Sequence, residues 1–279
     1  MSNAIRLIRD PESFPNFCIA YQPIVNVPAR RVIAYEALVR GHHNMTYPQL
    51  TEGMDVRTLS RYHRLLAEES IRAAVGLGLG PRRSSLTLNL QPDMGENALS
   101  PEFVKATAER FGLPLDRIVI EVTEDQRLST SDMHELHSWI RRCGFAVAID
   151  DFGAGYAGLT ALVETRPEIL KLDLELIRHI DVDEARQKVV SAFVRISAAL
   201  HVTIVAEGVE TLSECQTLRR LGIKLMQGYF FSKPVINELP RFDQCRGNGI
   251  HQMKRRSGPQ IDSGLWTPLF KRSPIEQLT

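Results

Sequence analysis

The sequence lacks the features that would place it among zinc-binding, disulfide-rich or membrane-spanning proteins. It has only four cysteines, which are scattered along the chain: Cys18, Cys143, Cys215 and Cys245. No two of them form a Cys-x-x-Cys pair, which argues against a zinc site and a disulfide scaffold and is typical of a reducing compartment. No apolar run approaches the roughly 18 residues of a membrane span, and the first residues lack the apolar core of a signal peptide. We therefore expect a cytoplasmic protein that does not insert into a membrane.

A net charge of one sign is also missing. The chain has 34 Lys and Arg against 33 Asp and Glu, so its formal charge is +1. Such a chain exerts no overall attraction on a nucleic-acid polymer, and a phosphate-bearing ligand must be held by local charges or metal ions. The length of 279 residues and the 43% hydrophobic content are those of an ordinary globular protein with a substantial core.

What the chain does contain is a series of short apolar runs of strand character, each closed by a polar or charged residue. Glu36 closes the first of these runs, residues 32–35. The residues that close the other runs are Asn89, Glu121, Asp150 with Asp151, Lys171, Glu207 and Gln227. Because a parallel barrel brings the carboxyl ends of its strands to one face, we expect these side chains to share one site.

Amphipathic stretches of helical period alternate with these runs. They cover residues 59–75, 101–111, 131–142, 184–200 and 211–221. This alternation indicates repeated βαβ units, and an opening strand at residues 18–25 brings the strand count to eight. The pattern favours an α/β fold with a single (β/α)8 TIM-type barrel, with a doubly wound open sheet as the alternative.

The ends of the chain differ from this central region. We expect residues 1–15 to form a lead-in, residues 16–245 to form the barrel, and residues 246–279 to form a polar, basic tail after a final helix. The tail contains the basic clusters Lys254-Arg255-Arg256 and Lys271-Arg272. We interpret these clusters as solvated rather than as contacts to nucleic acid or anionic lipid.

The expected site gathers five carboxylates, two amides and one lysine. Five carboxylates cannot all stay ionised at close range unless cations neutralise them, and Lys171 alone is too little. Carboxylate and amide oxygens suit Mg²⁺ or Mn²⁺, and the adjacent Asp150 and Asp151 are suited to bridge two such ions. Two metal ions roughly 3.5–4 Å apart activate water for in-line attack on phosphorus. The sequence therefore predicts a two-metal site that activates water for attack on phosphorus.

The segment after the paired aspartates, residues 150–156, contains Gly153 and Gly155. Glycines at this spacing allow the backbone to turn sharply and approach a ligand closely. We interpret the segment as a mobile loop next to the site, with an ordinary tight βα turn as the alternative.

Together these residues resemble the EAL-domain family of cyclic di-GMP-specific phosphodiesterases. The likeness covers residues 21–234, in the family's order and approximate spacing. The matching segments are Gln22-Pro23-Ile24-Val25, Glu36-Ala37-Leu38-Val39-Arg40, Asn89, Glu121-Val122-Thr123-Glu124, Asp150-Asp151-Phe152-Gly153-Ala154-Gly155-Tyr156, Lys171-Leu172-Asp173, Ala206-Glu207-Gly208-Val209-Glu210-Thr211 and Gln227-Gly228-Tyr229-Phe230-Phe231-x-x-Pro234.

The resemblance implies a barrel whose first strand runs against the others, two Mg²⁺ or Mn²⁺ ions, and hydrolysis of cyclic di-GMP to linear 5'-pGpG. Glu207 would be a metal-site carboxylate with a general-base role, and Lys171 would hold the attacking water or the phosphate oxygens. Gln227 would fix a metal-bound water. The implied metal-site residues are Glu36, Asn89, Glu121, Asp150, Asp151, Glu207 and Gln227.

The resemblance also assigns residues around the metal site. The implied substrate-binding residues are Gln22, Arg40, Asp173 and Pro234, with Arg40 on a phosphate. The implied residues that position the loop are Glu124, Gly153, Gly155 and Glu210. Family members often pair through the helices beside this loop, which implies a homodimer.

The chain departs from the family pattern in residues 41–63, where Gly41, His42 and His43 follow Arg40, and in the loop, where Ala154 replaces a common threonine. We interpret His42, His43 and His63 as solvent-facing or pocket-rim residues. None of the departures removes an implied metal ligand. Two alternatives stay open: a catalytically weak or inactive cyclic di-GMP receptor or protein-interaction module, and a barrel hydrolase acting on another phosphodiester.

Overall fold

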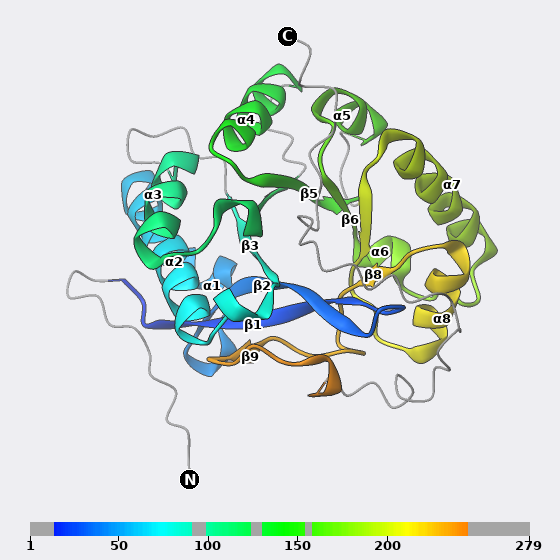
Figure 1. Ribbon diagram of the computed structural model, residues 1–279, viewed down its shortest axis with the longest axis horizontal. Helices are drawn as coiled ribbons and strands as arrows, with labels where there is room; N and C mark the ends of the chain where they lie inside the picture. The colour runs from blue at the N-terminus through cyan, green and yellow to red at the C-terminus, as the bar shows by residue number, and fades with distance from the viewer. Residues whose placement is uncertain (1–13, 91–98, 124–129, 154–157, 245–279) are drawn as a thin grey trace.

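The chain folds into a closed barrel of eight strands with a ninth strand outside it (Figure 1). The computed structural model describes residues 14–90, 99–123, 130–153 and 158–244. The strands are β1 (Phe17–Asn26), β2 (Arg31–Gly41), β3 (Ser85–Asn89), β4 (Ile118–Thr123), β5 (Ala146–Phe152), β6 (Ile169–Leu172), β7 (Thr203–Ala206), β8 (Leu225–Met226) and β9 (Val235–Ile236). Strands β2 to β8 are parallel, and β1 closes the barrel by pairing antiparallel with both β2 and β8. The predicted barrel with one reversed strand is confirmed.

Helices surround the strands on the outside of the barrel (Figure 1). They are α1 (Tyr47–Thr51), α2 (Val56–Gly76), α3 (Pro101–Phe111), α4 (Thr130–Arg142), α5 (Gly158–Thr165), α6 (Leu174–Ile177), α7 (Glu184–Leu200) and α8 (Leu212–Leu221), with the 3-10 turns η1 (His42–Asn44), η2 (Gly80–Arg82), η3 (Leu115–Arg117) and η4 (Phe242–Gln244). None of the helices in the described ranges is long and apolar enough to cross a membrane.

Several helix ends follow from local capping. Ser100 accepts a hydrogen bond from the Phe103 amide at the start of α3, and Asp183 accepts from the Ala185 and Arg186 amides at the start of α7. These caps satisfy amides that have no partner within the helix. The predicted ranges 101–111 and 184–200 agree with α3 and α7, whereas α2 starts three residues earlier than predicted because Asp55 caps it.

The inside of the barrel is a small apolar layer, and the larger core lies between the strands and the helices. The inner layer consists of Ile24, Ile33, Ala34, Val119, Ala148, Ile169, Val205 and Leu225. Side chains two residues apart on a strand point to the same side, so a residue two positions after an inner one also faces inward. By this rule Ala34 leads to Glu36, Val119 to Glu121 and Ala148 to Asp150. The predicted site therefore lies directly above the apolar floor of the barrel.

The polar residues lie at or near the ends of the strands, as expected, except in β2. Strand β2 continues past Glu36 to Gly41, because β1 still pairs with it there after the parallel pairing with β3 has ended at Glu36 and Thr87. Strands β4, β5 and β6 extend only one or two residues beyond Glu121, Asp150 and Lys171. In β2 the apolar pattern stops where the barrel interior becomes polar, not where the backbone pairing stops.

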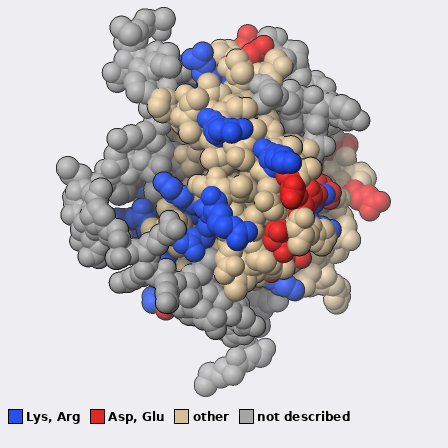
Figure 2. Space-filling model, turned by 90° about the vertical axis from the view of Figure 1, so that its right-hand side faces the viewer, with Lys and Arg blue, Asp and Glu red and all other residues tan. Residues whose placement is uncertain are grey.

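Charges are segregated on the outer surface although the net charge is close to zero. Figure 2 shows the side of the molecule that carries α7 and α8, where Lys and Arg lie mainly over the middle and Asp and Glu gather toward one edge. Local fields of both signs therefore exist on this face. The helix predicted after residue 241 lies, except for η4, outside the described residues.

Candidate functional site

Lys171 lies at the centre of the site, with its ammonium group among four carboxylates. Its Nζ is 2.8 Å from Asp150 Oδ1, 2.8 Å from Glu207 Oε1, 3.0 Å from Glu121 Oε1 and 3.8 Å from Glu36 Oε2. Its side chain is only 1% exposed. The barrel thus brings together side chains from β2, β4, β5 and β6 and from the residue after β7.

Three amide side chains complete this layer. Asn89 donates from Nδ2 to Glu36 Oε1 (3.2 Å), and Gln227 donates from Nε2 to Glu36 Oε2 (2.5 Å). Gln227 also donates to Gln22 Oε1 (3.2 Å), and Gln22 in turn donates to the Ser232 carbonyl. These bonds fix both oxygens of Glu36 and connect Gln22 with the carboxylates.

Two groups of three carboxylates have ligand atoms close enough to hold a cation, and they share one residue. The first group is Glu36, Glu121 and Asp150, and the second is Asp150, Asp151 and Glu207. Within each group the ligand oxygens lie within 4.8 Å of one another. Asp150, at the meeting point of the two groups, is therefore positioned to serve two cations.

The buried oxygens of this cluster fit a metal site. Glu121 Oε2 is buried without any polar partner, and Glu121 Oε1 is paired only with Lys171 Nζ, at 3.0 Å. A buried carboxylate without hydrogen bonds is costly, and one ammonium group cannot balance five carboxylates. Oxygen-only ligands in this arrangement are the set that hard divalent cations prefer. The residues present therefore fit a divalent-metal centre.

The pKa values of the carboxylates and of Lys171 are shifted by burial and by the excess of negative charge in the site. Burial raises the pKa of Glu121 to about 8; Lys171 opposes this rise, and the charges of Glu36 and Asp150 add to it. Burial also raises the pKa of Glu207 well above its usual range. For Asp151, burial and the neighbouring Asp150 raise the pKa to about 6. Burial disfavours the ammonium form of Lys171, but Asp150, Glu121 and Glu207 outweigh it and hold its pKa well above the usual value.

The backbone turns sharply directly after Asp150. Asp151 has φ +53°, and Gly153 has φ +104°. The Asp151 amide donates to Asp150 Oδ1 (3.1 Å), which fixes the Asp150 carboxylate against the turn. A Cβ at Gly153 would overlap the Leu176 side chain on α6. Glycine is required there because the backbone is left-handed and the neighbouring helix is close.

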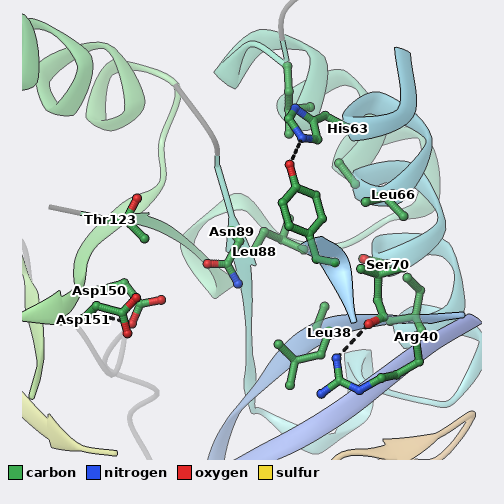
Figure 3. A pocket seen from close by; sticks show the side chains of 16 residues that line it. Leu38, Arg40, His63, Leu66, Ser70, Leu88, Asn89, Thr123, Asp150 and Asp151 are labelled. Carbon is green, nitrogen blue, oxygen red and sulfur yellow. Dashed lines mark hydrogen bonds between the residues drawn. The ribbon is translucent and has the colours of Figure 1, made fainter. Parts of the chain in front are cut away.

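A pocket of about 280 Å³ opens beside the carboxylates. Figure 3 shows Asp150, Asp151 and Thr123 on one side, His63 and Leu66 on the other, and Asn89 and Leu88 between them. Arg40 also lines the pocket, and its Nη1 donates to the Val39 carbonyl (2.7 Å). The pocket therefore joins an acidic end to an end with apolar, aromatic and cationic groups.

Other predicted site residues lie around this centre. Asp173 caps α6 by accepting from the Glu175 amide (2.8 Å), and its charge contributes to the raised pKa of Asp151. Pro234 is half-buried directly before β9. Glu210 is exposed, and its amide donates to Glu214 Oε2 at the start of α8. Glu124 and Gly155 lie outside the described residues.

Tyr47 lines the pocket and begins the short helix α1. Neither this residue nor this helix was predicted from the sequence. A signal was present, because Thr46 and Gln49 form a capping box with Pro48 in the first turn, a pattern typical of helix starts. His42 and His43 are exposed, whereas His63 is buried in the pocket wall.

Comparison with known proteins identifies the family of this barrel. The family model of the EAL domain matches residues 10–234. The chain belongs to the EAL domain family. Solved EAL structures are similar to it over most of its length. A standalone versatile EAL protein from Vibrio cholerae O395, in its c-di-GMP-bound form, has a TM-score of 0.73 and 33% sequence identity, covering 80% of this chain and 94% of that one. Klebsiella pneumoniae BlrP1, in a manganese and cyclic di-GMP complex, has a TM-score of 0.75 and 31% identity, covering 85% of this chain and 60% of that one.

Curated EAL relatives have differing functions. The probable cyclic di-GMP phosphodiesterase PdeN of Escherichia coli K12 is 30% identical over 232 residues, which are 78% of this chain and 43% of that protein. The cyclic di-GMP phosphodiesterase RocR of Pseudomonas aeruginosa is 30% identical over 239 residues, 82% of this chain and 59% of that protein. The blue light- and temperature-regulated antirepressor BluF of E. coli K12 is 32% identical over 231 residues, 79% of this chain and 55% of that protein. The chain spans about half the length of these relatives.

Proposed function

We propose that this EAL chain is a metal-dependent phosphodiesterase that hydrolyses cyclic di-GMP to linear 5'-pGpG and so lowers the level of this second messenger. The observation that carries the proposal is the pair of carboxylate groups that share Asp150 around the buried Lys171. The solved EAL structures in complexes with cyclic di-GMP, one of them with manganese, support both the substrate and the metal.

Seven residues would hold the metal ions. Glu36, Glu121 and Asp150 would bind one ion, and Asp150, Asp151 and Glu207 the other. Asn89 and Gln227 touch Glu36 and would complete the first site. Two Mg²⁺ or Mn²⁺ ions there would neutralise the carboxylates, lower the pKa of a water molecule and stabilise charge on the phosphoryl group.

The side chains of the chain would orient the substrate and move the proton. Glu207 lies in the second carboxylate group, with Oε1 2.8 Å from Lys171 Nζ, and it would act as the general base that takes the proton of the attacking water. The water oxygen forms a bond to phosphorus, the bond to the 3'-oxygen breaks, and that oxygen leaves as a hydroxyl with a proton from solvent. Lys171 would hold the water or a phosphate oxygen, and Arg40 would bind a phosphate with its planar guanidinium.

A product assay tests the proposal. We expect the purified chain with Mn²⁺ or Mg²⁺ to convert cyclic di-GMP to pGpG, and chromatography would measure the product. EDTA should abolish the conversion. Glu207→Gln should lower kcat by at least about 100-fold, in line with the loss of a general base. Glu184→Gln, at an exposed position on α7, is the matched control and should retain full activity. Full turnover by Glu207→Gln would contradict the assigned role.

One comparison favours a second candidate, a cyclic di-GMP receptor or protein-interaction module without catalysis. BluF, a relative at 32% identity, is an antirepressor. Tight binding of cyclic di-GMP with no product after long incubation with Mn²⁺ would support this candidate and reject the phosphodiesterase.

Assembly and location complete the proposal. We infer that the chain forms a homodimer, because the EAL resemblance implies pairing beside the loop that follows Asp151. We also infer a cytoplasmic location. Light scattering after size-exclusion chromatography measures the mass directly, and a mass near the 31.5 kDa of one chain would contradict the dimer. The boundaries at residues 16 and 245 stay predictions, which limited proteolysis would test.

A further inference from the structure

The pocket beside the carboxylates has a second end, of which the proposed chemistry uses only Arg40. Its wall there comes from β2, α1 and α2, and its apolar lining includes Leu38, Leu66 and Leu88. Figure 3 places His63 across the pocket from Asp150 and Asp151. A volume of about 280 Å³ is just below the usual range for small-molecule pockets, and it suits one flat ring system better than a whole dinucleotide.

Two aromatic side chains form a fixed polar group at this end. The Tyr47 hydroxyl and His63 Nε2 are 2.5 Å apart and hydrogen-bonded. The two rings stack with centroids 5.7 Å apart and planes inclined by 26°. His63 is 5% exposed on α2, while Tyr47 begins α1, whose start is fixed by the Thr46 and Gln49 capping box. The pair is therefore held in place before any ligand binds, which lowers the cost of binding.

The chemistry of this pair differs from that of a charged group. A tyrosine hydroxyl and a neutral imidazole can each donate or accept a hydrogen bond. When Nε2 accepts, the hydroxyl hydrogen points to the histidine and the phenolic oxygen can accept from a ligand. When Nε2 carries the hydrogen, the hydroxyl can donate to the ligand instead. The pair thus matches a base edge that offers donors or one that offers an acceptor.

We propose that Tyr47 and His63 determine the base specificity of the site, and that they accept either purine of a cyclic dinucleotide. Guanine presents ring and amino N–H donors next to an acceptor oxygen, whereas adenine presents an amino donor next to an acceptor nitrogen. The apolar residues would contact the faces of the ring, and Arg40 in the same pocket would bind the attached phosphate. This inference rests on the proposed function, because it names the substrate class of the same site.

Equilibrium binding in EDTA tests the inference without turnover. Calorimetry would compare cyclic di-GMP with its adenine analogue. We expect the unmodified chain to bind both with dissociation constants within about tenfold. His63→Asp should raise the preference for guanine at least about tenfold, because a carboxylate accepts both N–H donors of guanine and repels the acceptor nitrogen of adenine; such base discrimination is worth about 1–3 kcal/mol.

Tyr47→Phe keeps the ring against His63 and so preserves the packing if His63→Asp proves unstable. We expect it to weaken the binding of both dinucleotides by about five- to tenfold and to raise KM while leaving kcat unchanged. His201→Asn is the matched control, because His201 is an exposed, left-handed cap of α7 where asparagine is tolerated. The control should change neither affinity nor preference.

Three outcomes would overturn the inference, and one of them would also overturn the proposed function. Wild-type binding of cyclic di-GMP with more than 100-fold discrimination against the adenine analogue contradicts it. Tyr47→Phe or His63→Asp variants that fold and bind like the His201→Asn control also contradict it. Both results leave the proposed phosphodiesterase intact. A folded wild-type chain that binds neither dinucleotide, in EDTA or with Ca²⁺, the ion in one solved cyclic di-GMP complex of BlrP1, overturns the inference together with the proposed function.

Discussion

Lys171 is the residue on which the electrostatics of the site depend. It is buried and lies within 4 Å of Glu36, Glu121, Asp150 and Glu207. Removing one partner of a buried ion pair costs about 3–5 kcal/mol, because the other charge is left without compensation. We expect Lys171→Met to lower the free energy of unfolding of the metal-free protein by about that amount, measured by urea denaturation at pH 7, and to lower kcat strongly.

A lysine on the surface provides the control for this prediction. Lys188 pairs with Glu184 at 3.7 Å, and both side chains are at least 80% exposed. Exposed ion pairs contribute little, so Lys188→Met should change the free energy of unfolding by less than about 0.5 kcal/mol. Equal effects of the two substitutions would show that Lys171 has no special stabilising role.

The raised pKa of Glu121 makes the stability of the metal-free protein depend on pH. Its folded pKa is about 8, above the usual value of about 4.3, so the folded state retains a proton that the unfolded state releases. The stability from this group is complete below about pH 4 and is lost as the pH rises to 8. We expect the free energy of unfolding in EDTA to fall over this range, with a slope of at most about 1.4 kcal/mol per pH unit for one proton.

Two comparisons check this pH dependence. Asp151, with a pKa of about 6, adds a smaller contribution at the lower end of the range because it is more exposed. Glu121→Gln removes one titrating group and should make the slope between pH 6 and 8 smaller, while Glu207, whose pKa burial also raises, continues to contribute. Mn²⁺ should reverse the slope, since metal ions displace protons from their ligands. A metal-free protein whose stability rises with pH across this window would refute the prediction.

Among the elements, the short helix α6 supports two of the proposed metal ligands. Leu176 of α6 packs where a Cβ of Gly153 would lie, and Leu174 packs where a Cβ of Gly208 would lie. Gly153 follows Asp151 by two residues, and Gly208 follows Glu207 directly. We expect Gly153→Ala to destabilise the protein by about 2–4 kcal/mol, from backbone strain and overlap together, and to weaken Mn²⁺ binding measured by calorimetry.

Gly53 provides a control that separates the effect of backbone strain from the effect of overlap with a neighbouring side chain. Gly53 has φ +76°, and no atom lies within 4 Å of the position that a Cβ would take there, so Gly53→Ala introduces only backbone strain, about 1 kcal/mol. The double variant Gly153→Ala with Leu176→Ala should bind Mn²⁺ better than Gly153→Ala alone. If Gly53→Ala and Gly153→Ala are equally harmful, contact with α6 does not position Asp151.

For the whole molecule, the barrel is closed most weakly beside β8. Strand β8 has two residues and forms two register pairs with β7 and two with β1, whereas β1 and β2 share ten pairs. Local opening requires the least free energy where few hydrogen bonds and contacts are lost. We expect amides of residues 225–227 to exchange with deuterium faster than those of β1, β2 and β4, as measured by mass spectrometry. Equal protection across the barrel would contradict this.

The elements that were predictable from the sequence are those with strong local signals. Helices α3 and α7 have good N-caps and run over 11 and 17 residues, so their apolar period is complete. Helices α1 and α6 have five and four residues, too few to display a period. The end of β2 was not predictable from the apolar pattern, because its inward-facing side chains become polar before its pairing with β1 ends.

The barrel and the polar residues that face one site were predictable from the sequence alone, and the resemblance to the EAL family added the reversed first strand. Those features follow from local periodicity and motif order, which do not require knowledge of distant contacts. The folded chain adds that Asp150 belongs to both carboxylate groups, that the Lys171 ammonium contacts four carboxylates, and that Tyr47 meets His63. These contacts join residues from different strands and helices, and their geometry depends on the closure of the barrel, which brings together side chains whose spacing along the chain carries no information about distance.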